Sequence, residues 1–109
     1  NASVADSVIG LRSIVNPGAH LHRVVMMGAD YYETMAQIEE DHHLGLPPFG
    51  VGEGSVIENA ILDKNVRIGK NVVIRNHDWS PDEETETYVV RDGLVVVPKG
   101  AVIPDNTVI

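Results

Sequence analysis

The chain has 109 residues, no cysteine and a formal net charge of −8. That length suits one modest domain, and the acidic balance disfavours nucleic acid as a partner, because such binding needs a basic face. The lack of cysteine excludes a disulfide framework and fits a cytoplasmic protein. No apolar run reaches the length of a membrane span, and no signal segment opens the chain, so no membrane partner is expected.

The first element in chain order is a six-residue repeat that runs from Ser3 to Met26. In each repeat a large aliphatic residue is followed four residues later by a small or β-branched residue. The first positions include Ile9, Val15, Leu21 and Met27, and the fifth positions include Ser7, Ser13, Ala19 and Val25. Such a period predicts that these two positions point inward from the flat sides of a coil.

The second element, at about residues 28–50, interrupts the repeat. Asp30 followed by Glu33 resembles a capping box that opens a helix, and Gly45 with the prolines at 47 and 48 would end it. Three apolar residues would share the packed face of this helix: Tyr31, Met35 and Ile38. We expect a short excursion helix that packs on the body of the domain.

The repeat returns from Val51, slips by one residue to resume at Leu62, and returns again from Val97. One stretch shows the inward residues most clearly, at Val66, Ile68, Val72 and Ile74. The repeat predicts an all-β fold, a left-handed parallel β-helix of hexapeptide repeats with about four coils, in a single domain over residues 1–109. Three hexads make one coil, and coils stack about 4.8 Å apart. A β-sandwich is less favoured, because period six recurs in three separate blocks.

The last interruption, at about residues 76–90, is acidic and contains a proline, so it predicts an exposed loop with Trp79 as a candidate anchor. The chain opens directly on regular structure and ends on an apolar residue, which predicts a domain cut from a longer chain. A solenoid this short also needs its open ends covered by another domain or subunit.

The chain contains no phosphate-binding loop motif and no nucleophile elbow, so no catalytic residue is predicted. Five histidines are candidates for acyl transfer or metal binding: His20, His22, His42, His43 and His77. No third ligand is fixed by the sequence, so each is interpreted as an ordinary surface histidine and no metal site is predicted. The acidic runs at 39–41 and 82–84 are interpreted as solvated charge.

Half of the eight basic residues lie between Lys64 and Arg75. If the second loop is a bulge within one hexad, Val97 lies three hexads after Leu62 and Lys99 stacks on Lys64. Two ammonium groups that close repel each other unless an anion bridges them, so this register predicts an anion-binding pair.

A second register stays open. If a full extra hexad runs from Arg91, the two lysines fall on different sides of the prism. In either register these cations are also explained as charges that balance acids on a solvated face. Arg67 and Lys70 receive no assigned role.

Four segments follow one another over nearly the whole chain: "VIGLRS", "MMGADYYET", "GVGEGSVIENAILDKNVRIGKNVVI" and "YVVRDGLVVVPKGAVIPDNTVI". In this order they closely resemble the C-terminal domain of glucose-1-phosphate adenylyltransferase, also called ADP-glucose pyrophosphorylase. The part "MGADYYE" is distinctive, because neither the repeat nor a helix requires it.

The resemblance implies that residues 1–109 are the C-terminal part of a longer chain. That parent enzyme makes ADP-glucose and pyrophosphate from ATP and glucose 1-phosphate, for glycogen or starch synthesis. Its catalysis and its Mg²⁺ belong to an N-terminal nucleotidyltransferase domain that is absent here, so this domain alone would be inactive and hold no cofactor. The resemblance also implies that this domain contributes to a homotetramer and to allosteric control by a phosphorylated or carboxylated metabolite.

In the family, two lysines bind the activator, and they match Lys64 in "DKNVRIGKN" and Lys99 in "DGLVVVPKGAVI". Pro98 and Gly100 replace the family's usual leucine and asparagine beside the second lysine, a departure that bears on which activator is bound.

Two other functions were weighed. A hexapeptide-repeat acyltransferase would be a trimer that binds acyl-coenzyme A between prisms and uses a catalytic histidine. A purely structural solenoid would bind no ligand near Lys64 and Lys99.

Overall fold

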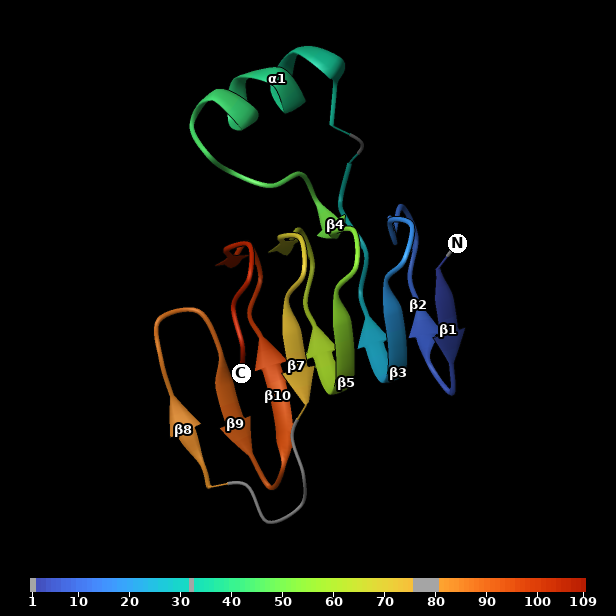
Figure 1. The fold of residues 1–109 in the computed structure, drawn as a ribbon, viewed down its shortest axis with the longest axis vertical. Coiled ribbons are helices and arrows are strands. Elements are labelled where there is room, and N and C mark those ends of the chain that lie inside the picture. Colours follow the sequence, from blue (N-terminus) through green and yellow to red (C-terminus); the bar gives the residue numbers. More distant parts are fainter. Residues whose placement is uncertain (1, 32, 76–80) are drawn as a thin grey trace.

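The computed structural model describes residues 2–31, 33–75 and 81–109. Its strands wind into a parallel β-helix, and a single described α-helix lies outside it (Figure 1). The elements in chain order are β1 (Ser3–Ala5), β2 (Val8–Ile9), β3 (His20–Met26), α1 (Met35–His43), β4 (Gly50–Val51), β5 (Val56–Leu62), β6 (Arg67–Ile68), β7 (Val73–Arg75), β8 (Glu83–Glu84), β9 (Val89–Arg91), β10 (Leu94–Val97) and β11 (Val102–Ile103).

Parallel pairing joins the strands of successive coils, and the pairs β8–β9 and β9–β10 of the second insertion are antiparallel. One sheet has the order β1-β3-β5-β10-β9-β8, with β2 and β7 paired to β3 and β5, and a second sheet has the order β11-β6-β4. The longest strands, β3 and β5, each turn a corner and so contribute to two sides of the prism (Figure 1). Stacked parallel pairing of this kind excludes a β-sandwich, the alternative to the β-helix.

A coil without an insertion advances by 17 residues, one fewer than three full hexads. The missing residue is at one corner of the prism, which is therefore shorter than the other two. Three residues with positive φ angles of 51°, 58° and 54° stack at this corner on successive coils: Asp6, Arg23 and Asn59. Because the chain turns one residue early at Arg23, Val24 and Met26 are buried. Val25 and Met27 are exposed instead, so their predicted inward positions were wrong.

The interior of the prism is filled by aliphatic side chains, as the hexads predicted. All four residues that the sequence singled out, Val66, Ile68, Val72 and Ile74, are at most 2% exposed. Burying an aliphatic side chain of this size stabilises a fold by about 1.5–3 kcal/mol relative to leaving it in water. The stacked core therefore holds the corners of the prism, and the charged residues on them, at fixed positions.

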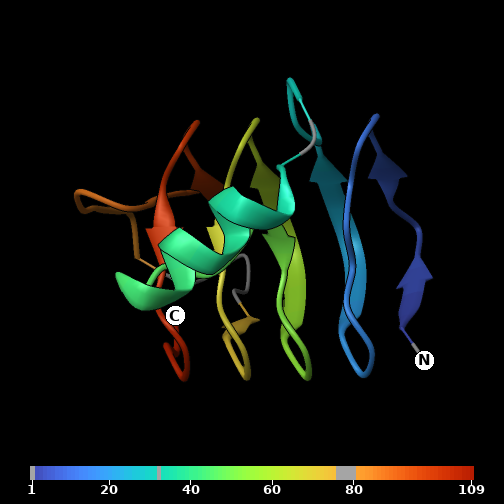
Figure 2. The same ribbon diagram turned by 90° about the horizontal axis from the view of Figure 1, so that it is seen from above.

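The first insertion carries α1, which lies across the stacked coils on one side of the prism (Figure 2). Its N-cap is Thr34, whose side chain accepts from the Gln37 backbone N–H while the Gln37 side chain accepts from the Thr34 N–H. The predicted capping box of Asp30 and Glu33 is therefore wrong. No residue of α1 is buried, and Met35 is 77% exposed, so the predicted packed face is also wrong.

The second insertion is an antiparallel extension of the sheet rather than only an exposed loop. β8 pairs with β9, and β9 pairs with β10, before the chain rejoins the coil. On rejoining, Val97 pairs with Leu62, which is the register that places the second loop within one hexad. His77 and Trp79 lie outside the described residues.

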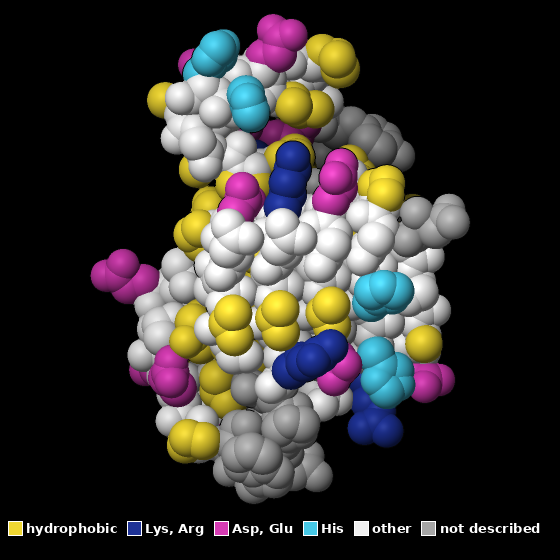
Figure 3. Space-filling view, in the orientation of Figure 1, with side chains coloured by type: hydrophobic (Ala, Val, Ile, Leu, Met, Phe, Trp, Pro, Cys, Tyr) yellow, Lys and Arg dark blue, Asp and Glu magenta, His cyan; other side chains and the backbone are white. Residues whose placement is uncertain are grey.

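One flat side of the prism carries a row of hydrophobic side chains beside charged residues and histidines (Figure 3). Val56 pairs with Val73 and Val73 with Val108, while Glu58 pairs with Arg75 one step along the strands. Among the described residues, no helix is long and apolar enough to cross a membrane.

Candidate functional site

The register of the coils brings Lys64 and Lys99 together at one corner of the prism. Each lysine lies two residues beyond the paired Leu62 and Val97. The turn that follows is shared between coils as well, because the Gly100 backbone N–H donates to the Lys64 carbonyl at 3.0 Å. The two predicted site residues are therefore neighbours on adjacent coils.

The anion between the two lysines is a carboxylate of the chain itself. Lys64 Nζ lies 3.2 Å from Asp30 Oδ1, and Lys99 Nζ lies 3.2 Å from Asp30 Oδ2. Hydrogen bonds to Lys99 and Lys64, with their positive charges, hold the pKa of the Asp30 carboxyl below its ordinary value of 3.8. The predicted repulsion is thus relieved by Asp30, which the sequence had assigned to a helix cap.

The corner residue Asn65 fixes the backbone of Asp30 as well as its side chain. Asn65 Oδ1 accepts from the Asp30 backbone N–H at 3.0 Å, and Asn65 Nδ2 donates to Asp30 Oδ2 at 3.3 Å. Asn65 has a φ of 59°, a conformation that asparagine tolerates better than most residues.

The chain reaches Asp30 through a crowded turn. Gly28 has a φ of +85°, and a Cβ atom there would lie 1.9 Å from the Leu11 carbonyl oxygen, so only glycine is compatible with this approach. The next residue, Ala29, donates its backbone N–H to the Leu11 carbonyl and accepts from Arg12 Nε at 2.8 Å. Asp30 therefore extends from a backbone that the preceding coil holds in place.

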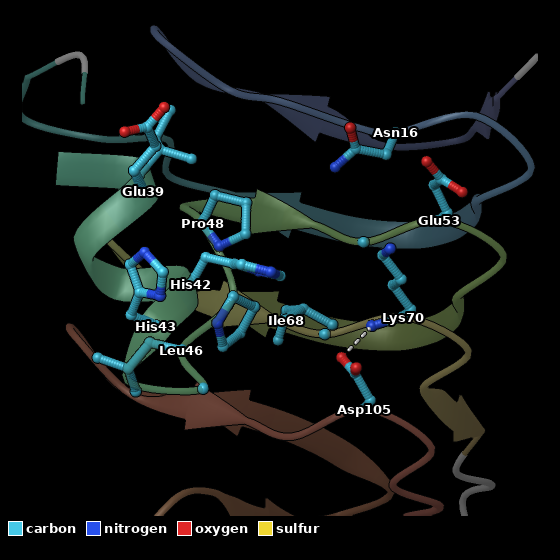
Figure 4. Close-up of a pocket in the computed structure, with 15 residues that line it drawn as sticks. Asn16, Glu39, His42, His43, Leu46, Pro48, Glu53, Ile68, Lys70 and Asp105 are labelled. Carbon is cyan, nitrogen blue, oxygen red and sulfur yellow. Dashed lines mark hydrogen bonds between the residues drawn. The ribbon is translucent and has the colours of Figure 1, made fainter. Parts of the chain in front are cut away.

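Another corner of the prism carries charges of opposite sign on adjacent coils. Glu53, Lys70 and Asp105 lie two residues beyond the paired Val51, Ile68 and Ile103, so their charges alternate in sign along the column (Figure 4). The Lys70 backbone N–H also donates to Asp105 Oδ1 at 2.8 Å. In that column the lysine lies between two acidic residues, whereas Lys64 and Lys99 are like charges on adjacent coils, whose repulsion an anion from outside the column relieves.

Arg67 anchors the excursion to the prism. Its Nη1 atom lies 3.2 Å from Glu33 Oε2 and 3.1 Å from Asp41 Oδ2, and it donates to the Pro47 carbonyl at 2.9 Å. Its guanidinium lies 4.4 Å from the ring centre of Phe49. Since the Arg67 and Glu33 side chains are only 16% and 6% exposed, this residue has a structural role rather than an effector-binding one.

An open groove of about 900 Å³ separates α1 from the prism (Figure 4). The helix contributes Ile38, Glu39, His42 and His43, and the corner column contributes Glu53, Lys70 and Asp105. Lys70 and the two histidines therefore line this groove and not the site of Lys64 and Lys99.

His20 and His22, on β3, form separate polar pairs. His20 Nδ1 lies 2.5 Å from Ser3 Oγ, and His22 Nε2 lies 3.4 Å from Asp6 Oδ2. Within the described ranges, no group of three histidine, aspartate or glutamate residues is placed to hold a metal ion.

The sequence reasoning missed Asp30 and Glu33 as parts of these corner sites. A signal was present, because "MGADYYE" is required neither by the repeat nor by a helix. The structure explains the segment: the glycine makes the close approach, Asp30 binds the two lysines, and Glu33 binds Arg67. The carboxylates of this segment needed partners that only the stacked coils provide.

Comparison with known proteins agrees with this architecture. A glucose-1-phosphate adenylyltransferase small subunit, chloroplastic/amyloplastic, of Triticum aestivum is 44% identical over 111 residues. The match covers 100% of this chain but only 24% of the relative's length. The family described as the GLGC left-handed parallel β-helix domain matches residues 1–108. These matches confirm the resemblance and the left-handed parallel β-helix predicted from the sequence, and the chain therefore belongs to the GLGC left-handed parallel β-helix domain family.

Proposed function

We propose that this chain is the regulatory and assembly domain of a glucose-1-phosphate adenylyltransferase. The parent enzyme would join ATP and glucose 1-phosphate into ADP-glucose and pyrophosphate, for glycogen or starch synthesis in the cytoplasm. Catalysis and the Mg²⁺ that accompanies ATP would belong to an N-terminal nucleotidyltransferase domain. Membership of the family and the 24% coverage of the wheat relative support this division.

The regulatory role is supported by one observation above all: Lys64 and Lys99 meet on adjacent coils and bind one carboxylate between them. Two ammonium groups held by a rigid corner are suited to a phosphorylated or carboxylated metabolite, since both offer anionic oxygens that accept charge-assisted hydrogen bonds. Both lysines are exposed, so a ligand can reach them without opening the core. The catalytic domain would supply further cations, and the chain by itself would bind anions weakly.

The assembly role is supported by the apolar surface of the first coil. Val8, Leu11 and Ile14 are exposed there, at the end of the β-helix that carries β1 and β2. Since the open end of a solenoid needs a cover, we propose that the N-terminal domain or a second subunit covers it in a homotetramer.

The test uses the full-length enzyme and measures ADP-glucose formation with and without a panel of phosphorylated and carboxylated metabolites. We expect activity in the intact protein and, for at least one metabolite, an activation that Lys64→Ala and Lys99→Ala each reduce several-fold. Arg75→Ala is the control, because it removes a cation whose partner is Glu58 on a flat side of the prism. An intact enzyme that makes no ADP-glucose contradicts the proposed function.

The acyltransferase alternative receives no support from the family match. It would be favoured only if the full-length protein formed a stable trimer and bound acetyl-coenzyme A. A mass measurement and a binding titration decide between the two assemblies.

A further inference from the structure

We propose that Asp30 is an internal competing anion, which occupies the site between Lys64 and Lys99 until an anionic effector displaces it. The inference rests on the function proposed above for the two lysines. Binding of the effector then releases Asp30 from the two lysines. This release couples the anion site to the rest of the excursion at residues 28–50.

The geometry of the occupied site supports competition. Asp30 gives one carboxylate oxygen to each ammonium group, at 3.2 Å in both cases. An incoming phosphate or carboxylate would need the same two donors in the same positions. The carboxylate already balances part of the charge of the lysines, so an effector meets less positive charge than it would without Asp30.

The ion pairs of Asp30 with the two lysines are weak enough for an effector to displace them. The Asp30 side chain is 37% exposed and both lysines are more exposed still, and exposed ion pairs of this type are weak because water competes for the charges. A phosphate group carries more charge than a carboxylate and has three acceptor oxygens. Replacement of Asp30 by such a group exchanges weak contacts for stronger ones.

The residues after Asp30 connect the site to the excursion. The residue after Asp30 is Tyr31, whose ring packs edge-to-face on the ring of Phe49 with centroids 5.4 Å apart. The Phe49 ring in turn lies under the guanidinium of Arg67. The backbone before Asp30 is fixed by Gly28 and Ala29 against the first coil. Movement of Asp30 is therefore transmitted forward, toward Phe49 and the anchor of α1, rather than backward into the prism.

The binding test measures the half-saturating concentration of inorganic phosphate for the full-length enzyme by calorimetry, at constant ionic strength set with chloride. Asp30→Asn keeps the size of the side chain but removes the competing charge, and we expect the half-saturating concentration to fall about three- to tenfold. Asp63→Asn is the matched control. It removes a charge next to Lys64, but Asp63 bonds the Lys64 backbone N–H and not its ammonium group.

A second measurement follows the segment itself. The Asp30 backbone N–H is protected by Asn65 Oδ1, so displacement of Asp30 should speed hydrogen exchange in peptides that cover residues 28–35. We expect saturating phosphate to speed this exchange in the wild-type enzyme, while exchange in the buried strand at residues 56–62 stays constant. Slower exchange at 28–35 with phosphate bound would overturn the inference.

The outcomes separate the two proposals. If Lys64→Ala and Lys99→Ala leave phosphate binding unchanged, the anion site proposed above is wrong whatever Asp30 does. If the lysine variants lose phosphate binding but Asp30→Asn binds phosphate no tighter than the wild type, the anion site holds and the competing role of Asp30 is wrong. An equal gain in Asp30→Asn and Asp63→Asn also overturns it, because the effect is then one of general charge.

Discussion

Lys99 lies directly above Lys64 on adjacent coils, because Val97 pairs with Leu62 across the strands that lead into the corner. The second insertion separates the two lysines in sequence but leaves and rejoins the prism without shifting this register. Their repulsion is relieved by Asp30, a residue of the first insertion. Both insertions therefore contribute to the site, one by preserving the register and the other by supplying the anion.

The contribution of Asp30 to stability should depend on pH in a defined direction. Its pKa is lower in the folded chain than the ordinary 3.8, chiefly through Lys99 and then Lys64. The ionised carboxylate therefore stabilises the fold above pH 3.8, and that stabilisation is lost as the pH falls below 3.8 through the lowered pKa. We expect the free energies of unfolding of the wild type and Asp30→Asn to converge in this range, as measured by denaturant titrations at a series of pH values.

Lys99→Ala provides the control for this pH effect. Because Lys99 is the largest cause of the lowered pKa, its removal should bring the Asp30 titration midpoint back toward 3.8, as followed by the carboxyl carbon resonance. A midpoint that does not move in Lys99→Ala would show that the ion pair is absent in solution.

Gly28 should tolerate no side chain. A Cβ atom would lie 1.9 Å from the Leu11 carbonyl oxygen, and the φ of +85° is unfavourable for alanine in addition. We expect Gly28→Ala to cost about 3 kcal/mol or more of unfolding free energy, because backbone has to move. Gly45→Ala is the comparison, since Gly45 has a similar φ of +78° but nothing within 4 Å of its added Cβ. It should cost only about 1 kcal/mol, and equal losses would contradict the steric explanation.

Arg67 should matter for stability more than the lysines do. Within the described part of the chain, its removal leaves the nearly buried Glu33 carboxylate with the Phe49 backbone N–H, at 2.6 Å, as its remaining donor. We expect Arg67→Met to cost about 3 kcal/mol, because an uncompensated carboxylate remains in a poorly solvated place. Circular dichroism during urea unfolding gives this number.

The double variant Arg67→Met with Glu33→Gln tests the reason for that loss. With both charges removed, no unpaired carboxylate remains, and we expect a smaller loss than in Arg67→Met alone. A double variant that loses the sum of both single losses would show that the two side chains act independently.

The prism could be predicted from the sequence because its rule is local. Aliphatic residues such as Ile68 and Ile74 recur at fixed spacing, and equivalent positions of each coil point into the core. The one-residue slip at Arg23 could not be predicted in the same way, since a positive φ at arginine has no compositional signal comparable to that of glycine. Met27 was misplaced for that reason alone.

The candidate site was only half predictable. Hexad counting proposed Lys64 and Lys99 as neighbours, but it left two registers open until the pairing of Val97 with Leu62 was known. Asp30 could not be derived, because the insertion follows no repeat and its path depends on contacts with other coils, such as that of Gly28 with Leu11. A carboxylate three residues before a glutamate matches a helix cap equally well by sequence alone.

Ser55 is the one polar residue among the fully buried side chains of the described chain, and it should be costly to replace. Its Oγ donates to the Gly69 carbonyl at 2.8 Å and accepts from the Val72 backbone N–H at 3.0 Å, so it joins two coils at a corner. Ser55→Ala leaves both backbone groups buried without these bonds, and we expect a loss of about 1–3 kcal/mol in the free energy of unfolding. Ser7 makes an equivalent bond from the Val24 N–H on the next coil, but it donates to the Ala5 carbonyl of its own coil and lies in the partly exposed first coil. Water can replace the lost bonds there, so Ser7→Ala should cost less than about 1 kcal/mol, and a loss as large as that of Ser55→Ala would show that burial is not what makes the inner serine important.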